Sequence, residues 1–556
     1  MFTKIWEKLK EVLRRMIGGK TIEKTLHVAP VMSSEMEKHI QLWADMYKNE
    51  APWVHEPSNQ DPTRVVSLGL PSLISSEKAR TALIEWESEI TTPTEEVEVD
   101  NPNYIEPKPD EFGNILPSVE PKTIIEEKPT TSEDRAKYLN EQYLKLKKQI
   151  RKQLEYGIAK GGLVIKPYPV ISKSKDEKGK EITSAAIEFD FIQADSFYPL
   201  AFDVSGKITE AAFVQTKKDK DMTYRRLEYH KWEGSNVRII NKAFKSTNNQ
   251  VGESQVELDL GEEIPLTSVP EWKDLQPQTL IKNVTKPLFA YFKMPEANTI
   301  DTNSPLGVSG YSRAIQLIKD ADMQYSRLLW EYEAGEMAVN VDRDAFKWLE
   351  DPNRPSDGHS VLPKGQQRLY RQVDVNLEQE LFQPYAPALR DSDYINGLNT
   401  ILMRIEDAVA LSRGTLSDVS VEARTATELK ILKQRSYMAN AEIQHALEDT
   451  LKDVIYIMNV YCTLYELTPE GEYDVNFEWD DSILVDVDVE ITKRLTLLQN
   501  GLMSKLELRM WYFGETERQA EEALRKIQEE TLSTMEDEMI MNQNETQFNN
   551  NLKEEE

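Results

Sequence analysis

The chain is organised around a helical stretch that reads Tyr311-Ser-Arg-Ala-Ile-Gln-Leu-Ile-Lys-Asp-Ala-Asp-Met-Gln-Tyr-Ser-Arg-Leu-Leu-Trp-Glu-Tyr332. Its apolar residues recur at i, i+3, i+4 and i+7, which predicts a helix with one buried face. The same spacing predicts a second helix over Tyr394–Val409. Between them, prolines and glycines exclude a long helix, and short β-type runs fit at Met337–Val341 and Gln367–Val375. We therefore expect two long helices joined at one end by a small β-rich insert.

A polar loop follows the second helix and reads Arg413-Gly-Thr-Leu-Ser-Asp-Val-Ser-Val-Glu-Ala-Arg424. The next residues, Thr425-Ala-Thr-Glu428, have the Thr-x-x-Glu pattern of a capping box, which starts a helix. The apolar periodicity then continues to Cys462, so this helix has roughly 35 residues and a length of about 50 Å. Helices of globular proteins average about 11–12 residues. A helix this long indicates a subunit that packs beside copies of itself in a large assembly.

Several stretches in this order resemble the portal proteins of tailed bacteriophages, especially those of siphophages that infect Gram-positive hosts. They are Val66-Ser-Leu-Gly-Leu-Pro71, Tyr156-Gly-Ile-Ala-Lys-Gly-Gly-Leu-Val-Ile-Lys-Pro-Tyr168, Ser304-Pro-Leu-Gly-Val-Ser309 leading into the first helix, and Arg424-Thr-Ala-Thr-Glu428. The resemblance extends over residues 1–530 and is carried by the order of the stretches.

The resemblance implies an α+β portal-type subunit with long stem and crown helices, a β-rich wing lobe and a small α/β clip inserted between two stem helices. Residues 1–300 then hold the N-terminal helices and the wing. The segments that follow are a first stem helix at 305–336, the clip at 337–390, a second stem helix at 391–412, a tunnel loop at 413–424, a long helix at 425–467, a wing return strand at 468–488, crown helices at 489–530 and a tail at 531–556.

The resemblance also implies a function. Portal subunits form a ring, here expected to have twelve copies, at one vertex of the capsid. The ring is a conduit for double-stranded DNA during packaging and ejection. The implied partners are the terminase large subunit, head–tail adaptor proteins, and the major capsid and scaffolding proteins, with no cofactor and no membrane. The subunit is made in the cytoplasm of the bacterial host and ends in the virion.

The loop at 413–424 is the candidate functional site. The resemblance implies that it projects into the tunnel and touches DNA through Arg413, Thr415, Ser417, Asp418, Ser420, Glu422 and Arg424. Gly414 gives the backbone freedom to turn, and the mixture of charges predicts weak, exchangeable contacts with phosphates. The alternative is a plain connection between two helices.

Composition limits the other classes of function. The chain has 556 residues and a net charge of −29, with 96 acidic against 67 basic residues. Proteins that bind DNA tightly need a basic surface, so this balance argues against tight binding but not against a conduit through which DNA slides. The single cysteine, Cys462, excludes an internal disulfide and fits a reducing cytoplasm. Its place in an apolar helical stripe predicts a buried thiol. No apolar run reaches the roughly 18 residues of a membrane span.

The rest of the chain is assigned from local patterns. Residues 2–17 predict an amphipathic helix with a basic side, for which docking on protein is favoured over a membrane-surface role. Residues 92–134 combine prolines with many acidic residues and predict a mobile surface loop. Further helices are expected at Ser33–Tyr47, Ser76–Ile90, Arg135–Glu155, 489–501, Ser504–Phe513 and 515–530, and strands at 162–168, 185–192, 211–216, 223–232, 237–240, 288–292 and 473–479, the last returning to the wing. After Thr531 we expect a disordered tail.

No pattern points to an active site. None of the six histidines lies within four residues of another, so no helical metal-binding pair exists. Gly19-Lys20-Thr21 lacks both the first glycine and the preceding strand of a phosphate-binding loop. The pair Asp480–Asp481 fits a polar turn better than a metal site. We therefore expect a non-enzymatic portal subunit; the alternatives are a head–tail adaptor or minor capsid protein, and then a metal-dependent nuclease or packaging enzyme.

Overall fold

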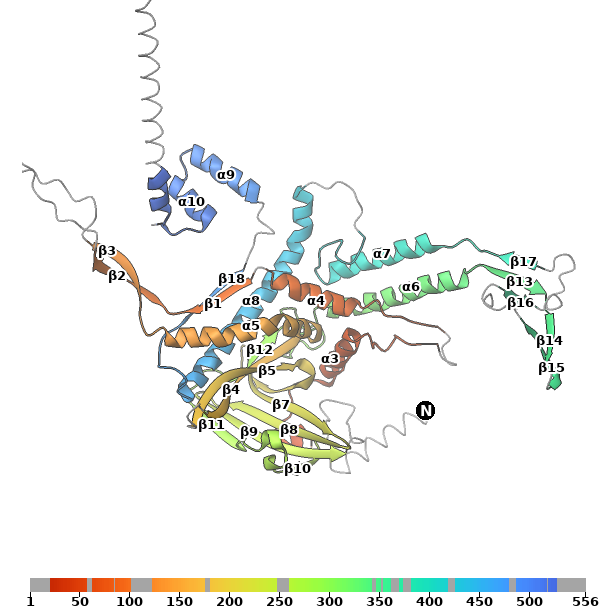
Figure 1. Ribbon diagram of the computed structural model, residues 1–556, viewed down its shortest axis with the longest axis horizontal. Helices are drawn as coiled ribbons and strands as arrows, with labels where there is room; N and C mark the ends of the chain where they lie inside the picture. Colours follow the sequence, from red (N-terminus) through yellow and green to blue (C-terminus); the bar gives the residue numbers. More distant parts are fainter. Residues whose placement is uncertain are drawn as a thin grey trace, which may run out of the picture. The chain divides into compact units, whose positions relative to one another are not determined.

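The computed structural model describes residues 21–57, 63–84, 86–101, 123–175, 181–247, 260–342, 347–351, 354–361, 370–373, 382–418, 426–479, 487–517 and 519–527. The chain divides into two compact units, Met1–Trp479 and Asp480–Glu556. The mixture of helices and sheets confirms the expected α+β class (Figure 1). The helix expected at 2–17, the pair Asp480–Asp481 and the tail after Thr531 lie outside the described residues.

Two long helices form one core of the first unit. They are α5 (Asp134–Lys160) and α8 (Ala426–Leu464). Apolar residues on one side of α5, including Leu146 and Ile150, pack in the same cluster as Leu451 and Val454 of α8. Both helices were expected, α8 from its apolar periodicity and α5 at Arg135–Glu155, and α8 has 39 residues. Its first residue follows Thr425, which lies outside the described residues, so the predicted capping box stays untested.

Antiparallel sheets occupy most of residues 162–293, as the sequence predicts. One has the order β12-β4-β5, from Ala290–Lys293, Gly162–Lys175 and Glu181–Gln193. The other has the order β10-β9-β8-β7-β6, with β11 also paired to β9. Its strands are β6 (Phe197–Phe202), β7 (Ile208–Asp219), β8 (Met222–Trp232), β9 (Asn236–Thr247), β10 (Glu262–Ile264) and β11 (Gln278–Lys282).

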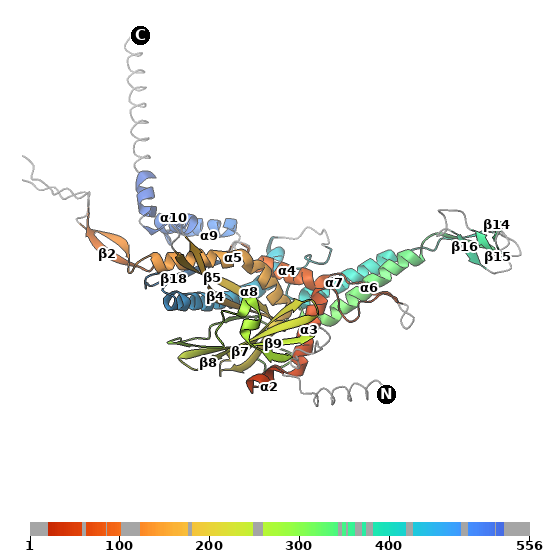
Figure 2. The same ribbon diagram turned by 60° about the horizontal axis from the view of Figure 1, so that its bottom comes forward.

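A helical pair forms the second core together with α3 (Ser34–Tyr47) and α4 (Leu70–Ala82). The pair is α6 (Ile315–Ala334) and α7 (Asp391–Ala408), which lie side by side in both views (Figures 1 and 2). The chain between them forms strands, as expected. One sheet has the order β16-β13-β17, and β14 pairs with β15. These strands are β13 (Ala338–Asp342), β14 (Lys347–Asp351), β15 (Arg354–Val361), β16 (Tyr370–Val373) and β17 (Phe382–Tyr385).

The expectation of a helix over Ser76–Ile90 is wrong in its second half. The helix α4 ends at Ala82, and β1 (Trp86–Thr91) follows. Buried and exposed residues alternate along β1, which is the period of a half-buried strand rather than a helix. The ends of the acidic segment are also strands, β2 (Thr94–Asp100) and β3 (Thr123–Pro129), which pair with each other.

The strand expected at 473–479 is present as β18 (Asp474–Trp479), but its partner differs from the expectation. It pairs antiparallel with β1 in a separate two-stranded ribbon, not with a sheet of residues 162–293. The inner face of this ribbon places Trp86 and Phe477 against the core of α5 and α8, which explains the pairing by burial of aromatic surface. Pairing over such a separation is invisible to local patterns.

The second unit contains α9 (Val487–Gln499), α10 (Lys505–Phe513) and helical residues 519–527. The predicted capping box at the start of α10 is confirmed. The backbone N–H of Glu507 donates to Ser504 Oγ at 3.0 Å, and the N–H of Ser504 donates to Glu507 Oε2 at 2.7 Å. No helix in the described part of the chain combines the length and apolar character that a membrane crossing requires.

A backbone-to-backbone contact joins two of the stretches that carry the resemblance. Gly161 ends α5 with a φ of +86°, and a Cβ placed there would lie 2.6 Å from the carbonyl oxygen of Gly307. A Cβ on Gly307 would lie 2.2 Å from the oxygen of Gly161. Hydrogen bonds complete the contact, because Met294 N–H donates to Gly161 O at 3.2 Å and Gly310 N–H to Ile158 O at 2.9 Å. Only glycine fits at both positions.

We therefore expect Gly161→Ala to lower the free energy of unfolding by about 2–4 kcal/mol, because it combines a left-handed backbone with a steric clash. The matched control is Gly206→Ala. Gly206 has a φ of +81° and no neighbouring atom within 4 Å of its added Cβ, so only the conformational cost of about 1 kcal/mol applies. Differential scanning fluorimetry compares the two variants; equal shifts in Tm would contradict the close packing of the two glycines.

Candidate functional site

The helix α6 is anchored through a buried carboxylate. Asp322 accepts hydrogen bonds from the N–H of Leu68 at 2.8 Å and from Trp53 Nε1 at 2.9 Å. One turn later, Ser326 Oγ accepts the N–H of Val66 at 2.9 Å. Burial raises the pKa of Asp322 above its ordinary value, and the two hydrogen bonds oppose this effect. The stretch Val66–Pro71 is thus held against the helix that the sequence identified as central.

At their strand-bearing end, α6 and α7 are joined by a charge pair. Arg390 donates to the buried Glu331 through Nε at 3.1 Å, through a guanidinium NH₂ at 2.7 Å and through its backbone N–H at 3.2 Å. The hydrogen bonds from the Arg390 side chain hold the pKa of Glu331 below its ordinary value, although burial raises it. This paired geometry fixes where the chain enters α7.

At the opposite end of α7, one buried carboxylate organises the start of the loop. Glu406 accepts hydrogen bonds from the backbone N–H groups of Gly414 at 3.1 Å, Leu416 at 2.6 Å and Ser417 at 2.9 Å. It also accepts one from Ser417 Oγ at 2.8 Å. A positive φ of 57° at Ala410 and of 89° at Gly414 turns the chain back toward the helix. Four donors satisfy the charge of a fully buried carboxylate.

The structure divides the predicted loop residues into three groups. Thr415 and Asp418 are exposed, and the Asp418 N–H donates to Asn399 Oδ1 at 2.8 Å. Arg413 is also exposed and forms an ion pair with Asp407. Ser417 is buried, and its hydroxyl donates a hydrogen bond to Glu406 within the subunit. The other three positions, Ser420, Glu422 and Arg424, lie outside the described residues.

Sequence reasoning missed Glu406, the residue that shapes the loop. Its place beside Ile405 on the apolar side of α7 was the available signal, because a carboxylate at a buried position requires donors. Three of the four donors are backbone N–H groups, which every residue except proline carries. No residue pattern in the loop therefore indicates them.

We expect Glu406→Gln to destabilise the loop, because it removes the charge that four donors surround and directs an amide N–H₂ at Ser417. The expected loss is about 1.5–3 kcal/mol, seen as a lower Tm and as faster amide hydrogen exchange at residues 414–417. Asp407→Asn is the control, because it breaks an ion pair near the surface whose contribution is about 0–1 kcal/mol. Equal effects of the two variants would contradict the role of Glu406.

The sulfhydryl of Cys462 is buried in α8, as the sequence predicts. Burial raises its pKa to about 11, although Arg135 opposes the shift. The described residues contain no group of three or more His, Cys, Asp or Glu side chains placed to hold a metal ion. Neither observation identifies a catalytic or metal-binding residue in the described part of the chain.

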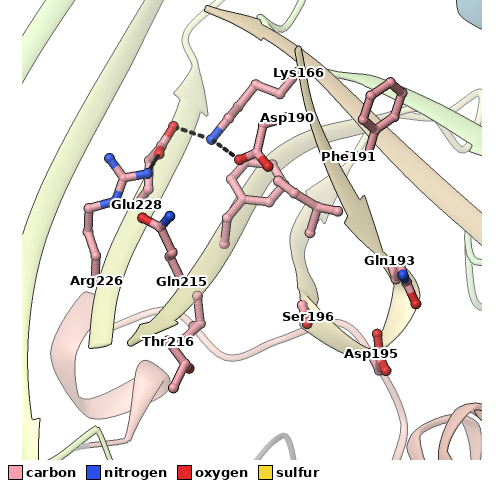
Figure 3. A pocket seen from close by; sticks show the side chains of 13 residues that line it. Lys166, Asp190, Phe191, Gln193, Asp195, Ser196, Gln215, Thr216, Arg226 and Glu228 are labelled. Carbon is pink, nitrogen blue, oxygen red and sulfur yellow. Dashed lines mark hydrogen bonds and ion pairs between the residues drawn. The ribbon is translucent and has the colours of Figure 1, made fainter. Parts of the chain in front are cut away.

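A polar cavity of about 390 Å³ lies between β4, β5, β7 and β8 (Figure 3). Lys166 Nζ donates to Glu228 at 2.8 Å and lies 3.6 Å from Asp190 (Figure 3). Arg226 lies 2.9 Å from the second oxygen of Glu228. Burial raises the pKa of Glu228, but Lys166, His230 and Arg226 together outweigh it and hold that pKa well below its ordinary value. The charges of this cluster are balanced within the lobe, so the cavity does not select a ligand of either sign.

The histidine of this cluster is held neutral. Its Nε2 lies 2.7 Å from Glu228 Oε1, and its Nδ1 has no hydrogen-bond partner in the described chain. The rings of Phe213 and Phe289 lie edge-on to its imidazole. Burial lowers the pKa of His230, and Glu228 opposes this only in part. Protonation would place an N–H at Nδ1 without an acceptor.

This environment predicts a loss of stability on acidification. Below the unfolded pKa of about 6.5, His230 gains a proton only in the unfolded state, so stability falls as pH drops from 7 toward the folded pKa. His230→Gln keeps a donor to Glu228 but does not titrate, and we expect its Tm to fall less between pH 7 and 5. His445→Gln, at an exposed position, is the control and should follow the wild-type chain. The same slope in all three proteins would contradict the prediction.

Comparison with known proteins supplies the family. The family model described as "Phage portal protein, SPP1 Gp6-like" matches residues 80–537. This range contains both helices of the α6–α7 pair, the strands between them, the loop that Glu406 organises, and α8. A search of curated proteins found no match. Because the family model covers most of the chain, the protein belongs to the SPP1 Gp6-like family of phage portal proteins.

Proposed function

We propose that this protein forms a ring of twelve subunits at a capsid vertex, through which double-stranded DNA passes during packaging and ejection. The family assignment supports a portal role. The observation that carries the proposal is the α6–α7 pair, which has inserted strands at one end and the Glu406-anchored loop at the other. In this proposal α6 and α7 are the stem helices and strands β13–β17 form the clip.

The exposed apolar surface of the helical pair supports packing against other copies. Only Ile405 and Glu406 are buried among the 18 residues of α7. Trp330 is 63% exposed, Met337 is 58% exposed and Ile395 is 40% exposed. Trp330 and Ile395 belong to the two helices, and Met337 follows α6. Neighbouring subunits in a ring would cover them.

The loop is proposed as the part that meets DNA. Thr415 and Asp418 are exposed beyond the turn that Glu406 holds, and Arg413 lies beside them. Ser420, Glu422 and Arg424 are included because they follow in the sequence of the predicted loop. A loop whose start is held by Glu406 and whose polar side chains carry both charges suits weak contacts with DNA. Such contacts do not slow a moving duplex, whereas a uniformly basic loop would bind the phosphates tightly.

The partners follow from the proposed position at the vertex. The strands β13–β17 would face the terminase large subunit during packaging and the head–tail adaptors afterwards. The major capsid and scaffolding proteins would surround the ring, and no cofactor is required. A head–tail adaptor or minor capsid protein is the alternative from the same structural class; a metal-dependent nuclease or packaging enzyme is the third.

Two measurements test this proposal. Native mass spectrometry with negative-stain imaging should show rings with a central hole and about twelve copies, since an interface made of large exposed apolar side chains favours stable association. A compact dimer under all conditions would contradict the ring. Hydrolysis of DNA or ATP that is abolished by substitution of Asp480 or Asp481 would contradict the non-enzymatic assignment.

A test of the loop requires a variant that keeps the hydrogen bonds to Glu406. Alanine at Asp418, Ser420, Glu422 and Arg424 changes the proposed contacts but keeps every described donor to Glu406. We expect normal rings and fewer DNA-filled heads when the variant replaces the natural subunit in infection, measured as nuclease-protected DNA per capsid. Alanine at Thr492 and Thr496 in α9 is the control. Failed assembly with normal DNA content in the surviving capsids would contradict this role for the loop.

A further inference from the structure

The helix α5 carries a basic face in a chain with a large acidic excess. The exposed cations on this face are Lys137, Lys145, Lys148, Arg151 and Lys152. Positions three and four apart are neighbours on a helix, so these side chains follow one side of α5. One exposed carboxylate, Glu141, lies on the same side, four residues from Lys137 and from Lys145. Leu144, which is 45% exposed, lies among them. In the described part of the chain, Lys137, Lys148 and Arg151 form no ion pair.

The outer face of the β1–β18 ribbon has the opposite charge. Glu87, Glu89, Asp474 and Glu478 are exposed there, and Glu87 lies directly opposite Glu478 in the register. Like charges directly opposite each other destabilise a strand pair. No cation among the described residues forms an ion pair with these four carboxylates. The ribbon therefore presents an acidic surface that a cationic partner would stabilise.

These two faces cannot meet within one subunit. The inner side of β1 already lies against α5, since Ser88 Oγ is 2.9 Å from Tyr143 Oη and the Ile90 N–H donates to Asn140 Oδ1 at 3.2 Å. On the outer side of β1, Glu89 accepts a hydrogen bond from Asn140 Nδ2 of α5 at 3.5 Å, whereas Glu87 lies opposite Glu478 of β18. The basic face of α5 lies opposite its buried face, which contains Leu146 and Ile150. Both faces are exposed among the described residues of the first unit.

The two faces also match in length. The basic face from Lys137 to Lys152 extends about 22 Å at 1.5 Å per residue. A six-residue strand such as β1 extends about 20 Å. A closed ring is built from contacts between two different patches of the same subunit. Complementary patches on two sides of one chain satisfy this requirement.

We propose that the basic face of α5 in one subunit docks on the acidic outer face of the β1–β18 ribbon of the next subunit. The proposal rests on the ring of the proposed function. Leu144 would contact the ribbon between the charged side chains, and Lys148 and Arg151 would pair with Glu87 and Glu478. Such a contact would make ring assembly sensitive to ionic strength, because exposed charge pairs are screened by salt.

Charge reversal tests the contact. Lys148→Glu with Arg151→Glu should raise the subunit concentration at half-assembly by roughly tenfold or more, because two attractions become repulsions. Glu87→Lys with Glu478→Lys should have the same effect, and the two pairs together should restore assembly. Lys218→Glu with Lys273→Glu is the control: it changes the net charge equally at exposed positions outside both faces and should leave assembly unchanged. Native mass spectrometry across a salt series gives the readout.

Site-specific crosslinking provides a measurement that does not depend on the strength of assembly. The only natural cysteine, Cys462, is buried. Subunits with Lys148→Cys and subunits with Glu478→Cys, mixed and treated with a short bis-maleimide, should form covalent dimers that contain one of each. Covalent dimers within either variant alone, and none between the two, would overturn the proposed contact.

The remaining outcomes separate this contact from other roles of the basic face. Intact rings with reduced DNA content in the Lys148→Glu, Arg151→Glu variant would show that the basic face serves DNA, which overturns the contact but not the portal function. Intact rings with normal DNA content would also overturn it. Absence of rings in the wild-type chain would overturn the contact together with the proposed function.

Discussion

The approach of Gly161 to Gly307 is the constraint on which the first unit depends. The two backbones lie too close for any side chain between them, and the contact joins the end of α5, the start of β4 and the entry to α6. The junction of the consecutive elements α5 and β4 is thereby fixed to the entry of α6, which lies far later in the sequence. Gly157 and Gly310 allow similarly close packing against Phe292 and Ile158 on either side. The position of α6, and of everything that α6 carries, follows from this packing.

Buried charges complete the positioning, each with its own set of partners. Asp322 ties α6 to the N-terminal segment, Glu331 ties α6 to α7, and Glu406 ties α7 to the loop. Arg135 donates to the carbonyl oxygens of Asn459, Thr468 and Pro469 at the end of α8. A buried charge without its partner costs several kcal/mol, so each of these contacts specifies one arrangement of segments distant in the sequence. The acidic excess of the chain is therefore left largely to its surface.

The distribution of apolar and charged side chains on the surface bears directly on how subunits assemble. Apolar side chains are exposed along the α6–α7 pair, and charge is separated between the basic face of α5 and the ribbon. Apolar contact supplies affinity, whereas charge complementarity selects the partner and its register. In a ring made from one kind of subunit, both are needed at each contact. The local arrangement of charge thus matters more than the net charge of −29.

The sequence by itself determined the elements whose signals are local. Periodicity identified α6, α7 and α8, and the Ser504–Glu507 pattern identified the start of α10. The order of several short stretches identified the family that the family model confirms. Tertiary structure alone decided three features. It set the pairing of β1 with β18, because strand partners are chosen by burial of Trp86 and Phe477 against distant helices. It set the backbone contact of Gly161 with Gly307. It also set the loop conformation, because three of the four donors to Glu406 are backbone N–H groups, which every sequence contains and only a fold can place.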